Sequence, residues 1–160
     1  MDIEKLTLLK RACDLIVSDP HLKSELDEKG NITKTFCNVG VRLICEALGL
    51  SLWPPNMLAN DMHDLMVENP SWVKCEGFEA SLHAKSGKIA IASRKGDGHG
   101  HVCVVYPGDL VESPSLAKLV PLVANVGAKV NGVVAVSKAF AVKDGEPSYF
   151  KYVGPSGHTG

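Results

Sequence analysis

Residues 98–106 have the sequence GHGHVCVVY, and from this stretch onward strand patterns dominate the chain. Val102–Tyr106 is the clearest strand signal, because a run rich in β-branched residues is followed at once by Pro107-Gly108. The glycines at its start predict a turn that leads into a strand beginning near His101. The pattern before Gly87 is helical, so the two halves of the chain differ in secondary structure.

In the first half, apolar residues recur at helical spacing. They predict helices over residues 3–17, 35–48, 57–68 and 79–85, with Thr33 or Thr35 as N-cap of the second helix. Residues 20–34 are expected to form a polar surface connection with a short helix over 21–26. Strands are predicted over 88–93, 102–106, 120–126 and 148–153, whereas 133–140 fits either a helix or a strand. Helices followed by a run of strands indicate an α+β fold, with an antiparallel sheet of four to six strands.

The composition is that of an ordinary globular domain. The chain has 160 residues, 45% of them hydrophobic and 22% charged, and a formal net charge of −1. Such a chain is long enough for one domain with its own core, and disordered or low-complexity classes are excluded. There is no basic excess to drive binding to nucleic acid or to an anionic membrane. No apolar run approaches the ~20 residues of a membrane span, so none is expected. The N-terminal residues lack a signal-peptide pattern, which favours synthesis in the cytoplasm.

The five cysteines are an odd number at wide spacings, without a C-x-x-C motif. This argues against a disulfide framework and against a structural zinc module. Most are expected to be reduced and buried, as for Cys45 within its helix, and Cys75 is expected in a loop. Cys37 differs, because it lies in the first turn of the predicted second helix. The helix dipole and unpaired N–H groups there stabilise a thiolate and lower the thiol pKa, so Cys37 is the candidate nucleophile.

His101 is the candidate general base, because an imidazole at the start of a strand is exposed enough to titrate and is held in place. The histidines at 21, 63, 83 and 158 have no such setting. Asn125 ends the next strand candidate and could accept a hydrogen bond from His101 if the two strands pair. An amide there would fix the tautomer of the imidazole. Should Asn125 face the other side of the sheet, Asn131 or Asp109 are the next candidates.

A metal site is the main alternative. His99, His101 and Cys103 alternate in sequence, so on a regular strand their side chains would share one face and could bind zinc. The glycines at 98 and 100 argue against a regular strand at His99, and no further ligand is evident.

The order of these residues resembles that of the papain-like cysteine hydrolases of bacterial cell-wall metabolism, the CHAP and NlpC-type families. The resemblance rests on residues 100–105, GHVCVV, which are similar to the G-H-V-A-V-V type string of these families, and less specifically on residues 35–39, TFCNV. The preceding strand, residues 87–92, is also similar. The resemblance covers roughly residues 33–153, with residues 1–32 as an N-terminal helical extension of a single domain. The helical stretch over 53–79 and the identity of the third catalytic residue depart from a close match.

This resemblance implies a papain-like fold and a peptidase or amidase that cleaves an amide bond of peptidoglycan through a thioester. Cys37, His101 and Asn125 would then be the catalytic residues, with no cofactor and no metal. The expected partners are peptidoglycan or another peptide or amide substrate. A delivery or immunity protein is a further expected partner if the chain is a toxin effector rather than a phage lysin, and action on the cell wall would then follow lysis or delivery. A catalytically inactive binding module of the same fold is the non-enzymatic alternative.

Overall fold

The computed structural model describes residues 2–155, and its centre is a six-stranded antiparallel sheet with the strand order β3-β10-β4-β5-β8-β9. This sheet is built from β3 (Trp72–Cys75), β4 (Ala90–Arg94), β5 (His101–Val105), β8 (Leu122–Val126), β9 (Asn131–Ala135) and β10 (Ser148–Tyr152). Two small hairpins are formed by β1 (Glu25–Leu26) with β2 (Ile32–Lys34) and by β6 (Val111–Ser113) with β7 (Lys118–Val120). The predicted α+β class and antiparallel sheet are therefore confirmed.

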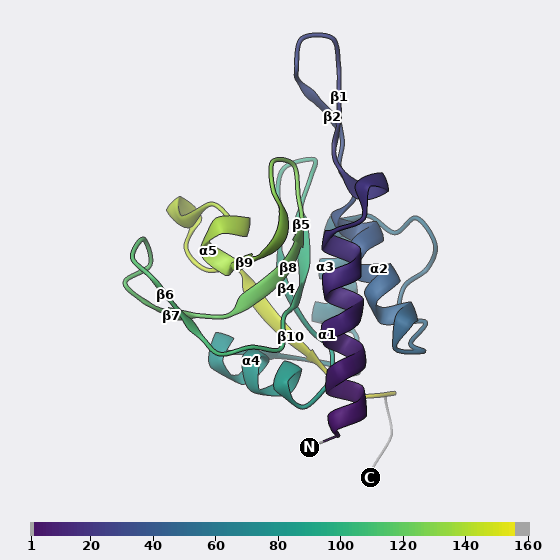
Figure 1. Cartoon of the computed structure of the whole chain (residues 1–160), viewed down its shortest axis with the longest axis vertical. Helices are drawn as coiled ribbons and strands as arrows, with labels where there is room; N and C mark the ends of the chain where they lie inside the picture. The colour runs from purple at the N-terminus through teal and green to yellow at the C-terminus, as the bar shows by residue number, and fades with distance from the viewer. Residues whose placement is uncertain (1, 156–160) are drawn as a thin grey trace.

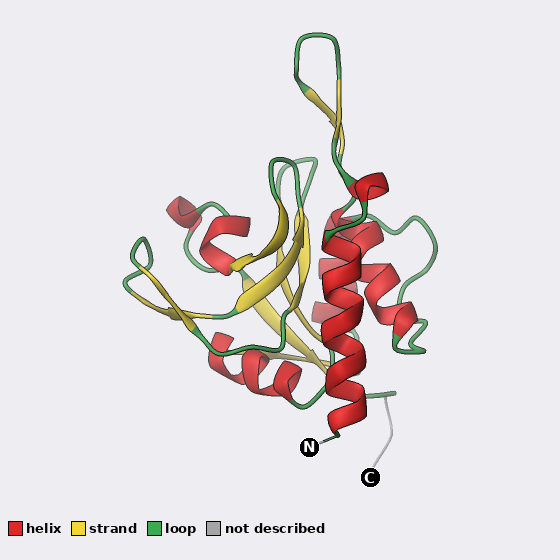
Figure 2. Ribbon diagram, viewed as in Figure 1, coloured by secondary structure: helices red, strands yellow, loops and turns green. Residues whose placement is uncertain are grey.

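The helices are α1 (Ile3–Val17), α2 (Cys37–Ala47), α3 (Ala59–Glu68), α4 (Gly77–Lys85) and the single turn α5 (Val136–Ala139), with 3₁₀ turns at Pro20–Leu22 and Val142–Asp144. In Figures 1 and 2, α1 and α2 lie together on one side of the sheet, and the hairpin of β1 and β2 extends away from the rest of the molecule. Helix α2 packs on β5 and β8, α4 packs on β4 and β10, and α5 packs on β8 and β9.

The central strands are buried on both faces. Every residue of β5 after His101 is fully buried, as are the first four residues of β4. Strands covered on both sides lack polar–apolar alternation and appear as continuous apolar runs. That is why Val102–Tyr106 is such a distinct signal in the sequence.

Close approach of α2 to the sheet depends on one glycine. A Cβ added at Gly40 would lie 2.9 Å from Cγ2 of Val126 on β8, so the absence of a side chain lets the helix sit against this strand. Ile16 of α1 also lies near this position, since an added Cβ at Gly40 would be 3.5 Å from its Cγ2. Leu9 and Cys13 of α1 are completely buried in the same core.

Several local predictions are wrong. The short helix expected over 21–26 is only a 3₁₀ turn at Pro20–Leu22, and residues 25–34 of the polar connection form a hairpin. All five residues of its two strands are exposed, so no burial pattern marks them. Helix α2 begins two residues later than predicted, at Cys37, and its N-cap is Phe36 without a side-chain cap, not Thr33 or Thr35. Cys75 ends the strand β3 instead of lying in a loop.

Two further segments, each predicted as one element, divide between two elements in the structure. Residues 133–140, which fit both structures, divide into the end of β9 and the turn of helix α5. The segment 120–126 contains the end of β7 and all of β8, with Pro121 between them. Proline cannot donate a ladder hydrogen bond, so it separates the small hairpin from the main sheet. Within residues 2–155, no helix is long and apolar enough to cross a membrane.

Candidate active site

The three predicted catalytic residues come from three elements that touch. Cys37 is the first residue of α2, His101 is the first residue of β5, and Asn125 lies near the end of β8. Helix α2 packs directly on β5, and β5 pairs with β8 in antiparallel register. The fold therefore brings the start of the helix and the ends of the two strands to one place.

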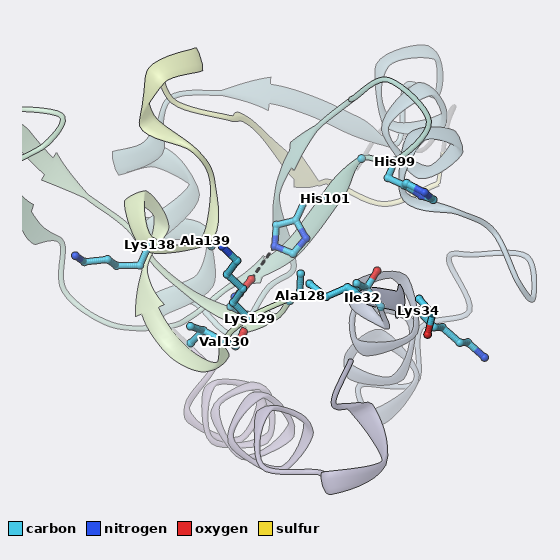
Figure 3. Close-up of a pocket in the computed structure, with 14 residues that line it drawn as sticks. Ile32, Lys34, His99, His101, Ala128, Lys129, Val130, Lys138 and Ala139 are labelled. Atoms are coloured by element: carbon cyan, nitrogen blue, oxygen red, sulfur yellow. Dashed lines mark hydrogen bonds between the residues drawn. The ribbon is translucent and has the colours of Figure 1, made fainter. Parts of the chain in front are cut away.

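His101 and Asn125 are joined by a hydrogen bond of 2.7 Å between Nε2 and Oδ1, drawn as a dashed line in Figure 3. The amide of Asn125 is oriented from its other end, because Nδ2 donates to the carbonyl oxygen of Val130 at 2.8 Å. With Oδ1 facing the ring, Nε2 must donate the proton. Nδ1 of the neutral imidazole then carries the lone pair and can accept a proton.

Cys103 takes part in the same contact. Its sulfur donates to Asn125 Oδ1 at 3.2 Å and lies 3.3 Å from His101 Nε2. Residues two apart on a strand share a face, which puts Cys103 beside His101, and the β5–β8 register continued by one residue puts Cys103 opposite Asn125. The sequence predicted that Cys103 and His101 share one face of the strand, but only as possible metal ligands. The buried contact of Cys103 with Asn125 was not predicted.

The imidazole of His101 is held by packing as well as by its hydrogen bond. The centroids of the His101 and Phe140 rings are 4.9 Å apart. The guanidinium of Arg94 in turn lies over the Phe140 ring, 5.5 Å from its centroid. Burial lowers the pKa of His101, and the hydrogen bond that His101 donates to Asn125 offsets this in part. The ring is consequently neutral at pH 7, as a general base must be.

Cys37 departs from its expected environment. Its side chain is only 5% exposed, and burial raises the pKa of the thiol rather than lowering it. Backbone N–H groups of Val102, Asn38 and Cys37 itself act to lower the pKa, as the position at a helix start predicts, but burial outweighs them. The prediction that the thiol pKa of Cys37 is lowered is therefore wrong. Among the hydrogen bonds of residues 2–155, none joins the Cys37 sulfur to His101.

A cavity of about 540 Å³ opens beside His101 and Asn125 (Figure 3). Its walls come from the second strand of the projecting hairpin, the loop before β5, the turn between β8 and β9, and α5. Cys37 is not among the lining residues, so the cavity reaches His101 and Asn125 but not the candidate nucleophile. Gly127 in this wall has to be small, since an added Cβ would lie 2.8 Å from Nδ2 of Asn125.

The loop that leads into His101 is held by Asn60 of α3, a residue that the sequence analysis did not identify. Asn60 Nδ2 donates to the Gly96 carbonyl at 2.9 Å, and the Gly96 N–H donates back to Oδ1 at 3.1 Å. A side chain at Gly100 would collide with Asn60 and with the Arg94 carbonyl. No local sequence signal links positions 36 residues apart, so this clamp could not be predicted.

The metal alternative lacks a set of ligands among the described residues. His99 lies exposed in the loop before β5, and Figure 3 shows its ring directed away from His101. The Nε2 of His101 is already bonded to Asn125. Among residues 2–155, no three His, Cys, Asp or Glu side chains are grouped as a metal site requires.

The remaining polar candidates have other partners. His63 bonds to the Ser93 hydroxyl, His83 bonds to the Tyr152 carbonyl, and His158 lies outside the described residues. Asn131 donates to the Leu22 carbonyl and accepts from the Gly127 N–H, so it has a structural role at the turn. The reserve candidate Asp109 pairs with Lys85 at the surface.

Comparison of the sequence with models of known protein families finds no match, and comparison with curated proteins finds no significant match.

Proposed function

We propose that the protein is a cysteine-dependent amide hydrolase in which Cys37 is the nucleophile, His101 the general base and Asn125 the residue that orients the base. The observation that carries this proposal is the bond from His101 Nε2 to Asn125 Oδ1, because it leaves Nδ1 with its lone pair. Helix α2, which begins at Cys37, packs on β5, which begins at His101, so the thiol and the imidazole belong to neighbouring elements.

The proposed reaction begins from a neutral thiol and a neutral imidazole, since burial disfavours the charged form of each. Nδ1 of His101 takes the thiol proton as the Cys37 sulfur attacks the carbonyl carbon of the amide. The imidazolium then gives this proton to the leaving amine, and a thioester remains on Cys37. Water, deprotonated by the same imidazole, hydrolyses the thioester. The backbone N–H of Cys37, at the start of α2, would hold the oxyanion.

The arrangement of elements also supports the proposal that the fold is papain-like. A helix that begins with the cysteine packs on an antiparallel sheet, and adjacent strands of this sheet carry the histidine and the asparagine. With the resemblance of residues 33–153, this makes peptide or amide bonds of peptidoglycan the proposed substrate class.

A non-catalytic role is the second candidate, and the burial of Cys37 favours it. A thiol that is 5% exposed and outside the cavity lining must become accessible before it can attack a substrate. An inactive binding module would keep the His101–Asn125 pair without this movement.

Incubation of the purified protein with peptidoglycan, followed by mass spectrometry of the products, tests the proposal. Release of fragments by the wild type but not by Cys37→Ala would support hydrolysis through the thiol. Fragment release that persists in Cys37→Ala would contradict it. If neither protein releases fragments but both bind peptidoglycan, the binding module is the better interpretation.

A further inference from the structure

The cavity beside His101 has a basic lining. Of its fourteen lining residues, three are lysines and none is aspartate or glutamate. The whole chain has 17 basic and 18 acidic residues, so this imbalance is local to the cavity. The three lysines, Lys34, Lys129 and Lys138, come from three separate elements: strand β2, the turn after β8 and helix α5.

These ammonium groups are left without carboxylate partners among the residues that the structure describes. Among residues 2–155, none of the three lies within salt-bridge distance of a carboxylate, whereas five other Lys or Arg side chains pair with carboxylates there. Lys34 faces Glu25 across the hairpin without pairing to it, and its ammonium lies over the Phe36 ring instead, 4.9 Å from the centroid. The positive charge is therefore available to a ligand.

The three lysines stand at different positions around the cavity. In Figure 3, Lys34 and Lys138 lie on opposite sides of His101 and extend outward from the rim, and Lys129 lies between them. All three are exposed, so each can turn toward a bound group. The lysines stand at different sides of one cavity, which fits several separate negative groups better than a single small anion.

We infer that the substrate is an acidic peptide whose free carboxylates flank the scissile amide and are bound by Lys34, Lys129 and Lys138. This inference rests on the proposed function. Carboxylates within about 10 Å of these ammonium groups would interact with them at moderate ionic strength. Each exposed pair adds modestly to binding, and several acting together would set a preference for acidic over neutral peptides. The preference would act mainly on substrate binding, because the lysines do not touch the atoms that react.

The test compares two forms of one peptidoglycan stem peptide, with its carboxylates free or converted to primary amides. Wild type, the single variants Lys34→Gln, Lys129→Gln and Lys138→Gln, the triple variant and the control Lys10→Gln are assayed for hydrolysis. Lys10 is exposed on α1, outside the cavity. We expect each single variant to lose about two- to five-fold in kcat/KM on the free form, mainly through KM. The triple variant should lose the preference between the two forms, and Lys10→Gln should behave as wild type.

Binding of both peptides to Cys37→Ala, and to the triple lysine variant in that background, is measured in parallel. This arm needs no turnover, so it separates the two proposals. Preferential binding of the free-carboxylate form without hydrolysis by the wild type would contradict the hydrolase but support the lysine assignment. Equal binding of both peptides, or a preference that survives the triple substitution, would overturn the assignment. So would stronger competition by an oligonucleotide of equal charge, which would indicate a polyanion instead.

Discussion

Nε2 of His101 and Oδ1 of Asn125 are 2.7 Å apart, and this bond sets the tautomer of the neutral imidazole. Asn125 cannot turn its amide over, because its Nδ2 is bound to the Val130 carbonyl. Cys103 adds a thiol donor to the same oxygen from the neighbouring strand. One amide oxygen thus receives two donors, and the imidazole presents Nδ1 as the only ring atom able to accept a proton.

Asn125→Ala should therefore disturb the tautomer before it disturbs the fold. We expect kcat/KM to fall, by less than in Cys37→Ala or His101→Ala, because the imidazole remains but is no longer oriented. The ¹⁵N shifts of the His101 ring should move from the Nε2–H tautomer toward a mixture of tautomers. Loss of activity with unchanged ring shifts would contradict an orienting role. Asn131→Ala is the matched control, since Asn131 bonds only to backbone groups.

The two histidines at 99 and 101 should differ sharply in their effect on rate. His101 is held by Asn125 and packs against Phe140, whereas His99 is exposed in the preceding loop. Removal of a general base typically costs ~10²–10⁴ in rate, so His101→Ala should show such a loss and His99→Ala should not. Steady-state kinetics with circular dichroism as a folding control measures this. Equal losses in the two variants would favour the metal alternative.

Much of this site could be predicted from the sequence because it depends on strand periodicity. The alternation of residues along β5 puts His101 and Cys103 on one face, and pairing with the next long strand brings Asn125 to them. The burial of Cys37 could not be predicted in this way. It depends on how closely α2 approaches β5 and β8, and this is set by Gly40 against Val126, a contact between residues far apart in the chain.

The missed strands have a similar physical cause. Strand β3 is short, lies at the edge of the sheet and has exposed Val73 and Lys74, so neither length nor alternation distinguishes it from a loop. It exists because β10 supplies hydrogen-bond partners along its length. The hairpin of β1 and β2 has no buried residue in its strands, and its apolar pair Leu26 and Ile32 is exposed.

Cys37 should react slowly with electrophiles near neutral pH, because burial raises its pKa. The thiolate is the reactive species, so the rate of alkylation by iodoacetamide should increase as the pH rises above about 8.5. Fast alkylation at pH 6 would contradict the neutral-pair mechanism and indicate a thiolate–imidazolium pair. Peptide mapping distinguishes Cys37 from the other cysteines, and a Cys37→Ala sample provides the control.

Cys45 gives a matched comparison for Cys37, since it lies two turns further along the same helix and is fully buried. Its sulfur accepts a hydrogen bond from Trp53 Nε1 at 3.4 Å, so Cys45→Ala should lower the free energy of unfolding by about 1 kcal/mol or more. Hydrolysis should be unchanged in that variant. Cys37→Ala should instead abolish hydrolysis, and retention of turnover would show that the thiol is not the nucleophile.

Three partly or largely buried histidines should make the protein less stable in mild acid. Burial lowers the pKa of His63, His83 and His101 below the ordinary value of 6.5. Between the folded and unfolded pKa values the unfolded chain binds more protons, so stability rises with pH in that window. The contribution is complete above about pH 6.5 and is lost as the pH falls through the folded values. The carboxylates of the half-exposed Asp19 and the exposed Asp27, whose pKa values are lowered by backbone hydrogen bonds, act only below about pH 4.

His83 offers the clearest test of this linkage, because it lies outside the candidate site. Its Nε2 is 2.9 Å from the Tyr152 carbonyl, a bond in which the neutral ring donates. His83→Gln keeps an amide donor at this position but cannot be protonated. Urea unfolding at pH 5, 6, 7 and 8 should therefore show a smaller loss of unfolding free energy between pH 7 and pH 5 in His83→Gln than in wild type. His99→Gln, at an exposed loop position, should keep the wild-type slope. An identical slope in His83→Gln and wild type would mean that His83 contributes nothing to the acid sensitivity and that the other two histidines carry it.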